Sequence, residues 1–474
     1  MQRFILLMFA AVLAACSTVG PDYHRPEQAL AQRDTANAAF VGGKEPVFAA
    51  APVPANWWRL YHDATLDALV REALAANTDL RVAAANIAKS RALAEFADAA
   101  RQPSTTIGAG ANYARRSAEE ELVGNKPLAN NWVYGVSAGV SYQVDLFGQI
   151  TRTIEAAHAD ARSAQAAYDA VRVTVVAETT RAYVEACSAG REIQVAERLV
   201  QVQARSRGLT ERLQTGGRAI ALDVLRSAAQ EDQVRSSLPS LQAKKQLALY
   251  RLATLTGHPP AEFSIAAQAC VHEPQLDAAL PIGDGAALLQ RRPDVRRAES
   301  ELQSATARIG VVTGDLYPKI TLGASIGSAG LAKDFLDAGT FKFSLGPLIS
   351  WQFPDRSRTR ANIRAAEADA SAAFARFDGT VLTALRETES ALTVYARDLD
   401  TRRLLEQARQ KSEKAVSDTD RLFASGRIGS LAVLDATRSL IATEQAVAAA
   451  DSRLAADQVA LFLALGGGWQ GEAE

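Results

Sequence analysis

Four segments of the chain alternate apolar residues with small or polar ones, which is the pattern of strands that present two different faces. In the segment at 131–146, aromatic and branched side chains such as Trp132 and Tyr142 take every second position, while glycine and serine take most of the others. The alternation predicts four strands. They lie at about 104–116, 131–146, 319–329 and 340–353.

The apolar face of these predicted strands has aromatic residues near its ends, and the opposite face is small and polar. Strands of an outer-membrane barrel alternate in this way between lipid and water. A soluble sandwich with one wet face is the alternative interpretation. Four strands are too few to close a membrane barrel, and open edges are not tolerated in lipid. The pattern therefore favours an oligomer, and it leans towards three chains, whose twelve strands would leave room for a pore.

Long helices are expected on either side of the strands. No proline occurs between Gly148 and Leu238 or after Pro354, and alanine, arginine, glutamate and glutamine dominate both stretches. This composition favours helices. The predicted helices lie at about 150–213, 218–256, 357–424 and 429–466. The two longest would measure roughly 100 Å at a rise of 1.5 Å per residue, far beyond the average globular helix.

The chain also resembles itself. Asp79-Leu80-Arg81 has a counterpart in Asp294-Val295-Arg296, and Gly217-Arg218 has one in Gly426-Arg427. Matches kept in the same order indicate an internal duplication. We therefore expect one structural repeat at 62–270 and another at 271–474, each with a helix, a strand pair, a long helix, a tight turn and a second helix.

The N-terminus has the features of a secretory signal. Arg3 precedes an apolar run that ends in Leu13-Ala14-Ala15-Cys16, and this run is too short to span a membrane. We expect residues 1–15 to be a signal peptide. The ending resembles a bacterial lipobox, which implies that Cys16 carries diacylglycerol and an N-acyl lipid such as palmitate, and that Ser17 directs the protein to the outer membrane. An ordinary signal peptide with an incidental Cys16 is the alternative.

Composition excludes several classes of protein. The formal net charge is −1, which excludes a strongly basic nucleic-acid binder, and three cysteines are too few for a disulfide scaffold. The five histidines lack metal-ligand spacing, and neither a phosphate-binding loop nor a nucleophile–base pair is recognisable. We therefore expect no enzyme, no bound metal and no cofactor other than the lipid.

Several motifs together resemble the TolC-like outer-membrane efflux factors, specifically the lipoprotein branch typified by OprM and the NodT-type proteins. They cover nearly the whole chain. Besides the lipobox, they are Asp145-Leu146-Phe147-Gly148, Gly283-Asp284-Gly285, Arg291-Arg292-Pro293-Asp294-Val295-Arg296 and Asp315-Leu316-Tyr317-Pro318. Their local chemistry is that of helix starts and sharp turns, so we expect structural roles for them.

The resemblance implies the fold and the function. The fold would be an α+β membrane protein, in which a trimeric outer-membrane β-barrel with four strands per protomer continues into a long periplasmic α-helical barrel. Residues 16–61 and the C-terminal tail would join an equatorial belt. The protein would be the passive outer-membrane channel of an RND-type tripartite efflux system and would conduct drugs or other toxic compounds. Its partners would be two further copies, a periplasmic adaptor and an inner-membrane transporter.

The resemblance also implies functional positions at two turns. The turn residues would contact the adaptor, although a plain helix–turn–helix loop is the simpler interpretation. They are Thr215, Gly216, Gly217, Arg218, Ser425, Gly426, Arg427 and Gly429. Asp420 matches an acidic position that forms a selectivity ring in relatives, and Glu211 is its counterpart in the first repeat. A carboxylate ring would attract cations, whereas an acidic residue on a long helix is more commonly just solvated.

Two questions stay open at this level. Cys187 and Cys270 are candidates for a disulfide in an oxidising compartment, with two buried free thiols as the alternative. For the function, a duct for type I protein secretion is the main alternative. A structural periplasmic coiled-coil lipoprotein is a weaker one, because it would need no alternating strands.

Overall fold

A computed structural model describes residues 18–468, except 116, 119–123, 125–127, 277–278, 335 and 352–355. The predicted signal peptide, the lipidation site Cys16 and residues 469–474 lie outside the described residues. The same is true of residues 116, 352 and 353 at the ends of two predicted strands.

The chain divides into two compact units, and each unit takes residues from both predicted repeats. Of the described residues, unit 1 takes those at 18–25, 87–163 and 298–377, and unit 2 takes those at 26–86, 164–297 and 378–468. The compact units are therefore not the two repeats at 62–270 and 271–474.

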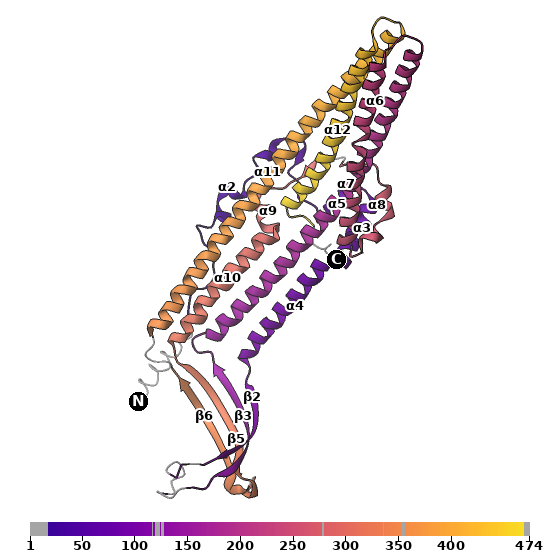
Figure 1. Ribbon diagram of the computed structural model, residues 1–474. Coiled ribbons are helices and arrows are strands. Elements are labelled where there is room, and N and C mark those ends of the chain that lie inside the picture. The colour runs from indigo at the N-terminus through magenta and orange to yellow at the C-terminus, as the bar shows by residue number, and fades with distance from the viewer. Residues whose placement is uncertain are drawn as a thin grey trace. The chain divides into compact units, whose positions relative to one another are not determined.

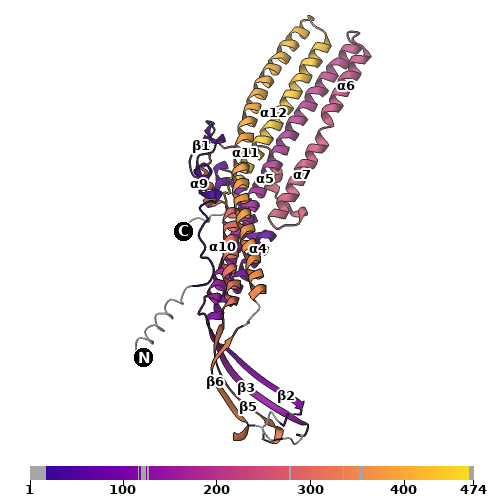
Figure 2. The same ribbon diagram turned by 90° about the vertical axis from the view of Figure 1, so that its left-hand side faces the viewer.

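Unit 1 contains a four-stranded antiparallel sheet, drawn in Figures 1 and 2. Its strands are β2 (Ser104–Ala114), β3 (Asn131–Val144), β5 (Lys319–Leu331) and β6 (Phe341–Ser350), paired in the order β2-β3-β5-β6. These strands run side by side and curve together in Figure 2. All four lie where the alternation predicts strands, and β6 follows β5 through two short 3₁₀ turns, at Ala332–Asp334 and Ala338–Thr340.

The turn from β3 into the helix α5 (Gln149–Thr215) shows why the motif Asp145-Leu146-Phe147-Gly148 stands there. The Asp145 carboxylate accepts hydrogen bonds from the backbone N–H groups of Ile150 and Thr151, at 2.9 and 2.8 Å. It thereby satisfies donors that have no partner within the helix. Gly148 has a φ of +78°, which favours glycine because a side chain is strained there.

Unit 2 is dominated by helices. Among the helices that lie wholly in this unit, α6 (Ala221–Arg235) and α12 (Ser430–Ala464) form hairpins with the long helices that precede them. α6 follows α5, and α12 follows α11 (Arg356–Ala424). The remaining helices of the described chain are α2 (Asp34–Asn37), α3 (Ala64–Ala76), α4 (Thr78–Asp98), α7 (Leu238–Leu255), α8 (Ile265–Ala269), α9 (Gly285–Arg291) and α10 (Pro293–Thr313). The short strands β1 (Phe48–Ala49) and β4 (Leu280–Pro281) pair in parallel.

The principal core of unit 2 gathers segments that are far apart in the sequence. Trp57 is fully buried and stacks on Phe462 of α12, with ring centroids 4.6 Å apart. Leu66 of α3 and Leu249 of α7 belong to the same cluster of buried residues. The predicted leader at 16–61 is therefore packed into the core of unit 2 through its last residues.

The prediction of one helix at about 218–256 needs correction. The structure has two helices, α6 and α7, separated at Ser236 and Ser237. Pro239 explains the break, because its ring displaces the carbonyl of the residue four positions earlier, Arg235, which is where α6 ends. The two serine hydroxyls donate to the carbonyls of Gln233 and Val234, both at 2.8 Å.

Among the helices of the described residues, none has both the length and the apolar composition required to cross a membrane.

Candidate functional site

The sheet has one apolar face and one face of small and polar residues. The register places Ile107, Ala138, Ile326 and Phe343 in one row, so these four side chains share a face. Ile107 is 82% exposed, Phe343 79% and, one row away, Leu345 83%. Such a large exposed apolar surface marks an interaction site with protein or lipid.

The opposite face is lined mostly by short side chains. Ser104 and Ser141 are register partners with their hydroxyls 2.7 Å apart, and Ser325 and Ser344 form a similar pair at 2.8 Å. Hydroxyl pairs of this kind show which residues point to this polar face. Water or a polar solute is the natural neighbour of such a surface.

The two turns predicted as tips have the same backbone geometry. After α5, the Arg218 N–H donates to the carbonyl of Leu213 at 2.8 Å, and the Gly217 N–H donates to that of Gln214 at 2.9 Å. After α11, the corresponding bonds run from Arg427 to Leu422 at 3.0 Å and from Gly426 to Phe423 at 2.9 Å. Both turns are Schellman motifs that close a helix on a glycine.

The predicted tip residues fall on these turns as expected from their positions in the sequence. Thr215 is the last residue of α5, Gly429 directly precedes α12, and the others form the connections. Large apolar side chains beside the turns are exposed. Leu222 is 47% exposed, Leu225 67% and Leu431 62%. The turns thus present an apolar surface together with one arginine each.

Glu211 and Asp420 each lie six residues before the glycine of the following turn, Gly217 and Gly426 respectively. Glu211 pairs with Arg207, whose Nε lies 3.3 Å from its Oε1. Asp420 is exposed, and within the described residues no basic side chain pairs with it. The Asp420 charge is therefore the less compensated of the two.

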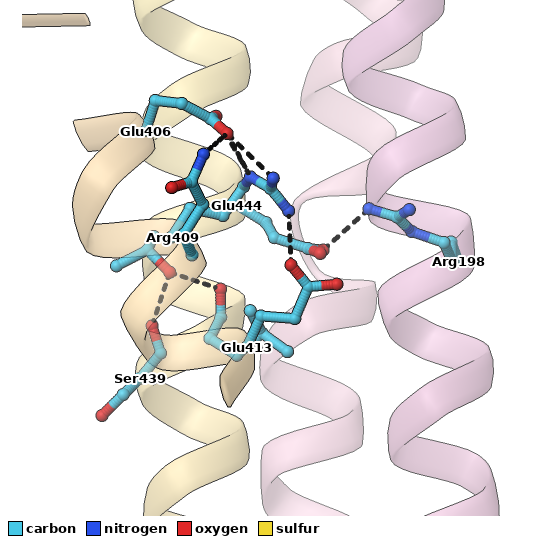
Figure 3. A network of polar contacts seen from close by, with 9 residues as sticks. Arg198, Glu406, Arg409, Glu413, Ser439 and Glu444 are labelled. Carbon is cyan, nitrogen blue, oxygen red and sulfur yellow. Dashed lines mark hydrogen bonds and ion pairs between the residues drawn. The ribbon is translucent and has the colours of Figure 1, made fainter. Parts of the chain in front are cut away.

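Figure 3 shows a group of ion pairs in unit 2, of which one joins α5 to α12 and the others lie within α11. Arg198 of α5 donates to Glu444 of α12 at 2.9 Å, and Arg409 of α11 contacts Glu406 at 2.8 Å and Glu413 at 3.1 Å. The hydrogen bond from Arg409 lowers the pKa of Glu406. The spacing of the three residues on α11 is visible in the sequence, but the pair across helices is not.

Two carboxyl groups face each other between α11 and α12. Asp457 lies in hydrogen-bonding contact with Asp398, and its Oδ2 is buried without a donor. Burial, and then the hydrogen bond and charge of Asp398, raise the pKa of Asp457 to about 6. Arg453, whose Nε is 3.8 Å from Asp398, partly compensates the pair, and its charge acts to lower the pKa of Asp457.

The motif Arg291-Arg292 closes the end of α12. Arg292 donates from Nη1 to the carbonyl of Ala464 at 2.9 Å, and Arg291 donates from Nε to that of Leu465 at 2.8 Å. Carbonyl groups at a helix C-terminus lack partners, and guanidinium groups satisfy them here. The sequence predicts a helix start at this motif, and Pro293 does begin α10. The contacts of Arg291 and Arg292 with the end of α12 cannot be read from the sequence.

The residues just after Cys16 are fixed to the start of α5 in unit 1. Arg152 has a side chain only 3% exposed, and its Nη2 lies 2.6 Å from Asp22. The same guanidinium donates to the Val19 carbonyl at 2.9 Å and to the Thr18 hydroxyl at 3.1 Å. Residue 16 is therefore two positions from a segment that is held at the junction of the sheet with α5.

Cys187 and Cys270 are joined by a disulfide bond, with their Cα atoms 4.8 Å apart. The bond ties the fully buried Cys187 of α5 to the segment that follows α8. Gly190 packs so closely on this segment that a Cβ atom there would lie 2.3 Å from the Cys270 carbonyl oxygen.

Within the part of the chain that the structure describes, no group of three or more His, Cys, Asp and Glu side chains is placed to hold a metal ion. The histidines that have partners bind single carboxylates or pairs of them. His258 contacts Glu72 at 2.7 Å, and His158 contacts Asp98 at 3.0 Å.

Comparison with known proteins gives consistent matches along nearly the whole chain. The profile of the family described as "Outer membrane efflux protein" matches residues 69–258 and 286–467. Outer membrane protein OprJ of Pseudomonas aeruginosa is 30% identical over 98% of this chain and 95% of OprJ. Nodulation protein T of Rhizobium leguminosarum bv. viciae is 28% identical over 98% of this chain and 94% of its own length. The solved structure of the outer-membrane channel OprN is 33% identical and superposes with a TM-score of 0.89 over 96% of this chain and all of that one.

Proposed function

Since the chain belongs to the outer membrane efflux protein family, we propose that it is the outer-membrane channel of a tripartite efflux system. In this role it would passively conduct small molecules, such as drugs or toxic compounds, from an inner-membrane RND-type transporter and a periplasmic adaptor to the outside. Members of the family are outer-membrane channel proteins and not enzymes, so energy for transport would come from the transporter.

The observation that carries the proposal is the two-faced sheet. Its exposed apolar face, with Phe343 and Leu345, suits contact with lipid, and its polar face suits a water-filled interior. Within the sheet, β2 and β6 each lack a neighbour on one side. Because unpaired backbone groups are not tolerated in lipid, each edge needs a strand from another chain.

We propose a homotrimer with a twelve-stranded barrel and a periplasmic helical barrel, built from the internal duplication. The matched hydrogen bonds around Gly217 and Gly426 support the duplication. The lipid on Cys16 would anchor each copy in the outer membrane. The contacts of Arg152 with Val19 and Asp22 support this arrangement, because they fix residues 18–22 next to the strand that would enter the membrane.

The two turns would contact the adaptor, and Asp420 with Glu211 would form the gate and selectivity region. The support is local: both turns carry exposed apolar side chains suited to protein contact, and Asp420 has a largely uncompensated charge.

Two measurements on the full-length protein test the proposal. Light scattering of the detergent-solubilised protein should give the mass of three chains, and insertion into planar bilayers should give discrete ion conductance. In cells that lack the native gene, expression should restore resistance to toxic compounds only when the adaptor and transporter are present. A monomer that passes no ions would overturn the proposal, and export of a polypeptide without any change in resistance would favour protein secretion instead.

A further inference from the structure

The charges of the four strands are of one sign. Lys319 and Lys342 are the only charged residues in β2, β3, β5 and β6, and no strand contains aspartate or glutamate. Both lysines lie on the polar face, since they alternate with the apolar residues of their strands. The sheet therefore presents positive charge only to the side that would face the interior.

The two lysines differ in their surroundings. Lys319, at the end of the sheet next to the helices, has its Nζ 3.2 Å from Asp315, which compensates its charge. Lys342 is exposed, and no acidic side chain of the described residues pairs with it. Lys342 is the second residue of β6, so it lies towards the opposite end of the sheet.

The row that contains Lys342 leaves its side chain uncovered. Lys342 pairs with Gly327, Gly327 with Ser137, and Ser137 with Gly108. The next row towards the helices contains only Ser344, Ser325, Gly139 and Thr106. The long cationic side chain of Lys342 is thus surrounded in these two rows by glycine, serine and threonine, whose side chains are all much shorter.

We propose that Lys342 is a selectivity residue that forms an anion-attracting ring in the barrel interior. The proposal rests on the proposed trimeric channel, in which three copies of Lys342 would lie at the same height and face one another across the pore. A ring of like charges in a narrow pore concentrates ions of the opposite sign. The cargo favoured at this ring is therefore anionic or neutral.

The first test is ion selectivity of the full-length channel in planar bilayers under a KCl gradient. Lys342→Met should lower the chloride-to-potassium permeability ratio by about twofold or more, Lys342→Glu should lower it further, and Lys342→Arg should preserve it. Lys333→Met is the matched control, because Lys333 lies in the β5–β6 connection, off the polar face, and is within 3.9 Å of Asp334. This control should leave the ratio near that of the native protein.

The second test needs no conductance. In the Ser344→Cys variant, the new thiol lies in the row next to Lys342. Its rates of labelling by an anionic and by a cationic methanethiosulfonate are measured on the detergent-solubilised protein. Adding Lys342→Met should reduce the ratio of the anionic to the cationic rate by about threefold or more, since a unit charge several ångströms away acts oppositely on the two reagents.

The outcomes separate the two proposals. Ordinary conductance with an unchanged permeability ratio and an unchanged labelling ratio would overturn the role of Lys342 and leave the channel standing. Absence of conductance from a correctly folded protein would overturn the channel, and with it the ring, even if the labelling showed a positive field at Ser344.

Discussion

Gly217 and Gly426 lie 209 residues apart in the chain and adopt the same left-handed backbone, with φ values of +73° and +74°. Each follows a long helix, and in each case the next residue is an arginine whose N–H reaches back five residues to a helix carbonyl. Added Cβ atoms would meet no other atom within 4 Å at either position. Glycine is therefore favoured at these positions by the left-handed backbone conformation and not by crowding from neighbouring atoms.

Alanine at Gly217 or Gly426 should weaken its turn by about 1 kcal/mol, because a Cβ atom disfavours the left-handed region. Local opening should then rise about fivefold, and trypsin should cleave at the adjacent Arg218 or Arg427 correspondingly faster. Gly216→Ala is the control, since Gly216 has no positive φ and its added Cβ would make only ordinary contacts at 3.5 Å. Equal cleavage of all three variants would show that the turn geometry does not depend on glycine.

The carboxyl pair Asp398–Asp457 predicts that stability falls as pH rises. Burial first and Asp398 second raise the pKa of Asp457 to about 6 in the folded state. The folded protein therefore favours the protonated form of this carboxyl group. Its stabilising contribution is complete below the ordinary aspartate pKa of about 4 and is lost as pH increases through about 6. Thermal unfolding of the native protein should therefore occur at a lower temperature at pH 8 than at pH 5.

Asp457→Asn should remove this part of the pH dependence and stabilise the protein by about 1 kcal/mol at pH 8, a modest value because solvent screens the half-buried pair. Asp435→Asn, which changes an exposed carboxylate on the same helix, is the control and should do neither. If both variants keep the native difference between pH 5 and pH 8, the pair is not its source.

The disulfide between Cys187 and Cys270 should contribute substantially to stability. It closes a loop with a sequence separation of 83 residues. The chain-entropy account gives about 4.5 kcal/mol for a loop of this size, so reductant or Cys187→Ala with Cys270→Ala should lower the unfolding temperature markedly. Peptide mapping without reductant should recover the two cysteines in one linked species, and alkylation of both in the untreated protein would contradict the bond.

Asp420 should affect ion selectivity more than Glu211. Asp420→Asn should reduce the preference for cations in planar bilayers, whereas Glu211→Gln should have a smaller effect because Arg207 already compensates that carboxylate. Reversal potentials in a KCl gradient provide the measurement. Equal, negligible changes for both variants would remove these residues from the selectivity region.

Much of the secondary structure follows from local patterns. Alternation places all four strands of the sheet, because one apolar and one polar face impose a period of two on the sequence. The turns at Gly217 and Gly426 are equally visible, since glycine marks a left-handed helix end. The break between α6 and α7 is too short to be predicted from composition, because residues that favour helices continue on both sides of it. Pro239 removes only one backbone hydrogen bond.

The side-chain pairs of the candidate site are harder to predict, because they join positions that only tertiary structure brings together. Arg292 directly precedes Pro293 at the start of α10, yet its Nη1 donates to the carbonyl of Ala464 at the end of α12. Asp398 and Asp457 are ordinary acidic residues in the sequence, and only the packing of α11 against α12 makes them share a buried contact. Lys342 is easily noticed in the sequence as a charge in a strand, but that no acidic side chain of the described residues pairs with it depends on the register.

The number of strands per chain has a consequence for assembly. Neighbouring strands run in opposite directions throughout the order β2-β3-β5-β6, so the first and last of the four are themselves antiparallel. Joining β6 of one copy to β2 of the next therefore continues the same alternation, and any ring of copies closes without a parallel seam. With an odd number of strands per chain, the two strands that meet at every junction would be parallel. An even number therefore allows identical chains to close an antiparallel barrel without any chain differing from the others.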